Sequence, residues 1–117
     1  MKRFAILSAV LCGLALTAPC YAGGYCAFAY STNTGKFGYS YGENSRPQAE
    51  RIALNACGTK DAQVVGWSHN EYVALALGDD NTWGCGVGST RRAAEHNALA
   101  LCPAKNAHVV KWVYSFD

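Results

Sequence analysis

Large and small residues alternate along two short stretches of the chain, residues 26–30 and 37–41. In both stretches aromatic residues recur at every second position, and Ala, Gly or Ser stand between them. This period of two predicts β-strands, and the polar turn Thr32–Gly35 between them predicts a hairpin. The same alternation returns at residues 73–77 and 83–87, so a second hairpin is expected.

Each predicted hairpin is followed by a stretch whose apolar residues recur at helical spacing. Ser45 is suited to cap the first helix, with Gln48 completing a capping box, and Gly58 is suited to the left-handed conformation past its end. Thr90 has the capping role in the second helix, which Pro103 stops. Helices are therefore predicted between these signals.

The second half of the chain repeats the first. Gln48–Cys57 aligns with Ala93–Cys102 at an offset of 45 residues, and the match continues through the third strands, predicted at 63–68 and 108–114. Before the helices the match persists with a one-residue shift, aligning Gly38-x-x-x-Gly42 with Gly84-x-x-x-Gly88. Solenoids need three or more copies to bury a core, so two copies predict one domain with an approximate two-fold axis.

The predicted fold class is α+β. We expect two tandem strand-strand-helix-strand repeats, about residues 25–69 and 72–116, that form one pseudo-two-fold domain with an antiparallel sheet and two helices packed on one face. Because alanine-lined helices can approach closely, we expect both on the bulky face of the strands. That face comprises Phe28, Tyr30, Phe37, Tyr39, Tyr41, Leu75, Leu77, Trp83 and Val87.

Residues 1–22 have the pattern of a secretory signal: Lys2 and Arg3, the apolar run Phe4–Leu16, then a turn and small residues. The apolar run is about 13 residues long, whereas a membrane-spanning helix needs about 20. We therefore expect cleavage before Gly23, a single duplicated domain over residues 23–117, no stable membrane anchor, and a secreted or periplasmic location.

Removal of the signal changes the charge balance. The whole chain has 10 Lys and Arg against 8 Asp and Glu, and the loss of Lys2 and Arg3 leaves 8 against 8. Phosphate binding needs a basic surface stripe, so this neutral balance argues against a nucleic-acid partner.

Four cysteines lie outside the signal: Cys26, Cys57, Cys85 and Cys102. An even number in an exported chain predicts two disulfides. Zinc sites usually pair cysteines two to four residues apart, and no such pair is present, so no metal is predicted. All four cysteines can lie in one layer between sheet and helices, and the connectivity stays open among three pairings.

Several segments resemble the bacterial secreted family called domain of unknown function 4189. The most specific are Gly88–Glu95, Ala53–Gly58 and Val64–Val65, and the resemblance covers residues 25–114. It implies export and a duplicated α+β domain, with no general reaction, substrate or catalytic set. Relatives often have cysteine where this chain has Ala62, Tyr72 and Tyr114. The family's disulfide pattern therefore does not carry over.

The three histidines, His69, His96 and His108, do not stand at spacings typical of metal or nucleophilic chemistry. The acidic segment Asp79–Asn81 has fewer oxygen ligands than a calcium loop needs, and it is interpreted as a turn. No catalytic residue, cofactor or metal ligand is predicted.

Binding features are more informative. Arg46, Arg91 and Arg92 stand at the helix starts, where positive charge opposes the helix dipole, and arginine forks grip carboxylates or phosphates. Trp83 and Tyr72, near a hairpin, are candidate partner contacts if exposed.

The sequence thus favours a non-enzymatic binding module that acts on an unidentified protein, of the inhibitor or secreted-effector type. The alternative hypothesis is a small envelope or extracellular hydrolase whose site lies near His108 or His69.

Overall fold

The computed structural model describes residues 23–116, which form two three-stranded antiparallel sheets and two helices. The first sheet has the strand order β2-β1-β3 and the second has the order β5-β4-β6. The elements are β1 (Tyr25–Tyr30), β2 (Phe37–Glu43), α2 (Arg46–Cys57), β3 (Gln63–His69), β4 (Tyr72–Leu77), β5 (Trp83–Gly88), α3 (Arg91–Leu101) and β6 (His108–Tyr114). The predicted signal, residues 1–22, lies outside the described residues.

The caps predicted at the helix ends are confirmed for Ser45, Gly58 and Thr90. Ser45 accepts a hydrogen bond from the Gln48 amide at the start of α2, and Gly58 follows its end at φ 74°. Thr90 caps α3 in the same way, through the Ala93 amide. The two hairpins, the two helices and the two third strands occur in the predicted order, so the α+β class and the strand-strand-helix-strand repeat are confirmed.

The layering differs from the expectation, because each helix covers the small-residue face of its own sheet. Ala27 and Ala29 of β1 pack against Ala49 and Ala53 of α2, and the second half repeats this cluster of alanines. A Cβ at Gly38 would lie well under 3.0 Å from backbone atoms of α2. Only a glycine at this position of β2 lets the backbone of α2 approach so closely.

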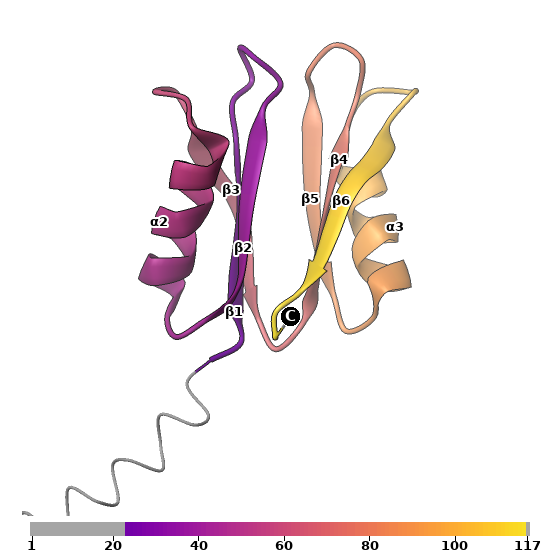
Figure 1. The fold of residues 1–117 in the computed structure, drawn as a ribbon. Helices are drawn as coiled ribbons and strands as arrows, with labels where there is room; N and C mark the ends of the chain where they lie inside the picture. The colour runs from indigo at the N-terminus through magenta and orange to yellow at the C-terminus, as the bar shows by residue number, and fades with distance from the viewer. Residues whose placement is uncertain (1–22, 117) are drawn as a thin grey trace, which may run out of the picture.

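The bulky faces of the two sheets meet each other instead of the helices. The buried cluster between them contains residues from both halves: Cys26, Phe28, Val73, Leu75 and Val113. The order of layers is therefore helix, sheet, sheet, helix, with α2 and α3 on the outside (Figure 1). This order buries the large apolar side chains of both hairpins together, where they lose the most contact with water.

The predicted layer of four cysteines is wrong. Cys26 and Cys85 belong to the cluster between the sheets, whereas Cys57 and Cys102 lie under α2 and α3, on opposite outer faces. All four are free thiols in the described part of the chain, so the two predicted disulfides are absent there. The alternation of side chains along the strands correctly predicted that Cys26 and Cys85 lie on the bulky face. It did not predict that the other sheet covers this face in place of a helix.

Within residues 23–116, neither helix is long and apolar enough to cross a membrane.

Candidate functional site

The two sheets are close together along one pair of edges and apart along the other. At the closed edge β3 packs against β5, and at the open edge β2 lies opposite β6. The approximate two-fold relation exchanges β2 with β5 and β3 with β6, so it would make the two edges alike. Their difference must come from residues that differ between the two copies.

At the closed edge, Gly66 of β3 lies directly under the Cys85 side chain of β5. A Cβ added at Gly66 would collide with the Cys85 sulfur. The repeat alignment matches Gly66 with Lys111 and Cys85 with Tyr39. The open edge therefore has a long cation and a large ring at the two positions where the closed edge has no side chain and a small thiol.

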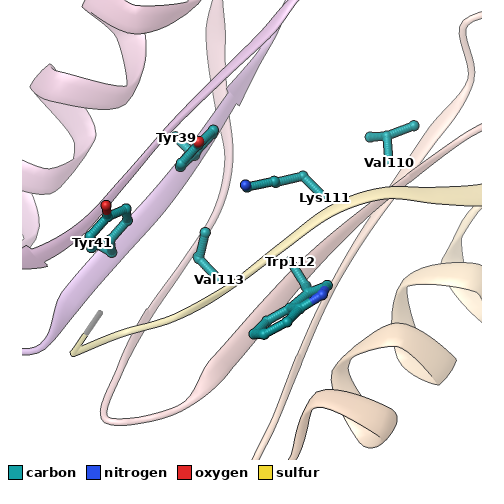
Figure 2. Close-up of a pocket in the computed structure, with 6 residues that line it drawn as sticks. All are labelled: Tyr39, Tyr41, Val110, Lys111, Trp112 and Val113. Carbon is teal, nitrogen blue, oxygen red and sulfur yellow. The ribbon is translucent and has the colours of Figure 1, made fainter.

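A groove of about 390 Å³ occupies the open edge. Its walls come from β2 and β6, and Figure 2 shows Lys111 reaching from β6 toward the tyrosines of β2, while the Trp112 indole turns away from them. The residues that line it are Tyr39, Tyr41, Val110, Lys111, Trp112 and Val113. We call this site the open-edge groove.

One wall of the groove is a pair of tyrosines. The rings of Tyr39 and Tyr41 stack with centroids 6.3 Å apart, and Tyr41 is 44% exposed. These residues are two positions apart on β2, so both point to the same side of the strand, while Ser40 between them donates a hydrogen bond to the Ala49 carbonyl of α2. The tyrosines thus present a partly exposed aromatic surface to the groove.

The opposite wall contains a β-bulge. The register of β6 against β4 shifts between Leu75 and Ala76, so the neighbours Val110 and Lys111 both line the groove. The register of β3 against β1 shifts at the corresponding place, between Phe28 and Ala29. A β-bulge changes the direction in which nearby side chains point. This bulge occurs in both copies of the repeat, and in β6 it directs Lys111 toward β2.

Lys111 places a positive charge in the groove. Its Nζ lies 4.7 Å from the centre of the Tyr39 ring. The ion pairs within residues 23–116 join Arg46 to Glu50 and Arg91 to Glu95, so no described carboxylate neutralises Lys111. The groove therefore combines aromatic and aliphatic surface with one cation.

A backbone hydrogen bond closes one end of the groove. The Gly42 amide at the end of β2 donates to the Ser115 carbonyl, just after β6, at 2.6 Å. Behind it the Ser115 hydroxyl contacts the Ser68 hydroxyl at 2.8 Å and the buried Cys26 sulfur at 3.4 Å. This polar cluster fixes the distance between the sheets at that end.

Arg46 and Arg91, predicted as partner contacts, lie on the outer faces and not in the groove. The Arg46 guanidinium is 4.3 Å from the centre of the Trp67 ring, and Arg91 has the same relation to Trp112 at 4.5 Å. Each also binds the glutamate four residues later, at 2.8 and 3.2 Å respectively. Cation–π and ion-pair contacts therefore explain why two arginines stand at helix starts, where the helix dipole alone disfavours a positive charge. Arg92 is exposed.

The two predicted aromatic contacts are also separated. Trp83 is partly buried and packs against the cluster between the sheets. Tyr72 lies on the outer face beside α3, with its ring 4.6 Å from that of Tyr114 and 6.0 Å from that of Trp112. The structure does not bring the predicted contact residues together in one place.

The histidines occupy three separate places. His69 stacks on Tyr25 with ring centres 4.0 Å apart, His96 is exposed on α3, and the His108 ring contacts the Asn106 carbonyl at 3.5 Å. Among the described residues, no three His, Cys, Asp or Glu side chains are grouped to hold a metal ion.

Two turn carboxylates have lowered pKa values for structural reasons. Hydrogen bonds from Ser31 and Thr59 lower the pKa of Asp61, and hydrogen bonds from Thr82 lower that of Asp80. Asp80 organises the predicted acidic turn itself, and Asp61 accepts hydrogen bonds from Ser31 and Asn33 in the first hairpin turn.

Sequence reasoning missed Tyr39, Tyr41 and Lys111 as site residues. A usable signal was present in the repeat, because aligned positions in the two copies differ most in size at Gly66 and Lys111 and at Cys85 and Tyr39. In a sandwich of two equivalent halves, such a pair of differences marks the edge that cannot close.

Comparison with known proteins agrees with this fold. The chain is similar to the NMR structure of Rv1813c from Mycobacterium tuberculosis, with a TM-score of 0.59 and 28% sequence identity over 77% of this chain and 73% of that chain. No curated protein matches the chain. The model of the family described as "Domain of unknown function (DUF4189)" matches residues 25–115, as the sequence resemblance implied, and the chain therefore belongs to this family.

Proposed function

We propose that this chain is an exported, non-enzymatic binding module that acts on another protein, and that the open-edge groove is its binding site. The observation that carries the proposal is the unequal pair of edges: a duplicated sandwich closes over Gly66 and Cys85 but stays open over Lys111 and Tyr39. Partly exposed aromatic side chains, tyrosine among them, are enriched where proteins recognise each other.

The hydrolase alternative has less support from the arrangement of side chains. His69 and His108, its candidate residues, lie on strands of different sheets, and neither lines the groove. A nucleophile needs a base within hydrogen-bond reach. Cys26 is fully buried, and its sulfur contacts the hydroxyls of Ser68 and Ser115, so it is withdrawn from substrates.

Export to the periplasm or the medium is the second part of the proposal. It is supported by the signal pattern of residues 1–22. Cys26, Cys57 and Cys102 are buried and Cys85 is partly buried, each packed as a small apolar residue.

Site-directed photocrosslinking tests the groove. A photoreactive residue replaces Tyr41 in the groove, and a matched variant carries it at Leu101, which is 63% exposed on α3. We expect a reproducible protein adduct from position 41 in the medium, the periplasm or target cells, and none from position 101. Equal labelling from both positions, or no adduct at position 41, contradicts the proposal.

A second variant separates the groove from the rest of the surface. The double variant Tyr39→Cys and Lys111→Gly copies the residues of the closed edge onto the open one, and we expect this variant to fold and to lose the adduct.

The hydrolase alternative is tested by replacing all three histidines with alanine. The triple variant should leave the adduct unchanged, whereas a phenotype that is lost only in the triple variant supports the hydrolase.

A further inference from the structure

We propose that the occupant of the open-edge groove is an extended segment of the partner protein, added as a strand along β2 or β6, with an acidic side chain facing Lys111. This inference rests on the proposed function, because it names the chemistry of the partner at that site. It follows from the strand edges, from the charge in the groove and from the spacing of the lining residues.

The backbone of the groove is suited to a strand. β2 and β6 are edge strands, each paired on one side only, with β1 and β4 respectively. Edge strands present unpaired N–H and C=O groups, and an extended peptide satisfies them by main-chain hydrogen bonds. Both edges border the same groove, so away from the hydrogen bond between Gly42 and Ser115 a segment lying in it can pair with either strand.

The charge in the groove selects the partner's side chain. Lys111 is partly buried, lies over Tyr39 and has no carboxylate partner among residues 23–116. A carboxylate near a partly buried ammonium is screened less by water than one at a fully exposed site, so its attraction is stronger. Aspartate or glutamate is therefore the complementary residue.

The spacing of the lining residues fixes a pattern in the occupant. Lys111 and the buried Val113 are two positions apart on β6 and line the same groove, and Tyr39 and Tyr41 are spaced in the same way on β2. Successive side chains of a strand point to opposite sides, so every second residue of the occupant faces inward. The expected pattern is an acidic residue two positions from an apolar one.

A random peptide display library tests this pattern against the exported chain. We expect selected peptides to contain Asp or Glu two positions from an apolar residue. For a selected peptide, Lys111→Met, which keeps the apolar stem, should weaken binding roughly ten-fold. Lys111→Glu should shift the selected residue to Lys or Arg, and Lys105→Glu, at an exposed lysine outside the groove, should change nothing.

Amide hydrogen exchange with a selected peptide identifies the edge that is used. Main-chain pairing should slow exchange at alternate amides of β2 or of β6, with no change in β3 and β5. Slowed exchange confined to β3 or β5, or an unchanged preference for acids in the Lys111→Glu variant, would falsify the inference. Failure of the library to enrich any sequence also overturns it.

The remaining outcomes distinguish this inference from the proposed function. If position 41 captures a partner but no peptide is enriched, the binding function stands and the added strand is wrong. If acidic peptides bind along β2 or β6 but no partner is captured, the groove chemistry stands and the proposed function fails. An adduct between two copies of this chain shows self-association and overturns the inference.

Discussion

Cys85 shows at the scale of one residue how position determines chemistry. Its side chain lies over Gly66 in the cluster between the sheets. Burial, and to a lesser extent the neighbouring Cys26, raises the pKa of the Cys85 thiol to about 12 from its ordinary value of 9.0. The thiolate is the reactive form, so this position makes the thiol inert in the folded protein.

The raised pKa of Cys85 predicts a loss of stability in alkaline solution. Above about pH 9 the unfolded chain releases the Cys85 proton, whereas the folded chain keeps it up to a pKa of about 12. The stability that the protonated Cys85 thiol contributes is therefore fully present below pH 9. Between pH 9 and pH 12 the free energy of unfolding falls by roughly 1.4 kcal/mol per pH unit. Urea denaturation across this range should show a steeper decline in the wild type than in Cys85→Ala. Parallel declines would contradict the prediction.

At the scale of elements, the distance between helix and sheet depends on glycines. Gly38 on β2 lies against the backbone of α2, and Gly84 and Gly86 on β5 lie against that of α3. A side chain at these positions has no space unless the helix moves. The small-residue face is therefore a requirement of helix docking and not only a consequence of strand composition.

Gly38→Ala should destabilise the protein although alanine normally favours folding over glycine. The new Cβ would meet backbone atoms of Ala53 and Cys57 at well under 3.0 Å, and relieving this overpacking costs about 1–3 kcal/mol. Gly23→Ala is the matched control, because its nearest atoms lie at 3.8–4.0 Å. Urea denaturation of both variants measures the difference, and equal stabilities would refute the close approach.

Elements could be predicted from the sequence because their signals are local. Ser45, Gly58 and Thr90 act through hydrogen bonds or backbone angles within a few residues of each helix end. The choice of packing face was not local: period two separates bulky from small faces but does not say which face meets a helix. The exposure of Tyr41 and the surroundings of Lys111 depend on β2 lying opposite β6, and no local pattern contains that information.

At the scale of the whole molecule, the contact between Gly66 and Cys85 holds the two halves together along the closed edge. It joins β3 of the first sheet to β5 of the second. The aligned pair Lys111 and Tyr39 makes a longer contact across the open edge. The approximate symmetry is thus broken by side-chain size at two positions.

Gly66→Ala should be costly in the wild type and much less costly when Cys85 is already alanine. The new Cβ collides with the Cys85 sulfur, and only the milder 3.2 Å contact with the Cys85 Cβ remains after truncation. We expect a coupling free energy of about 1–3 kcal/mol in a double-mutant cycle followed by urea denaturation. Lys111→Ala combined with Cys85→Ala is the control and should show additive effects. Additivity in the Gly66 cycle would mean that the closed edge does not depend on this contact.

Under the proposed function, the difference between the two edges also determines how many ligands one chain can bind. Two equivalent edges could each hold a ligand, but here Cys85 lies over Gly66 and fills the space between β3 and β5. If the open-edge groove is the binding site, one chain takes one ligand strand, so it would shield a partner's exposed edge and would not crosslink two partners. The duplication supplies the scaffold, and the departure from symmetry would then make the complex one to one.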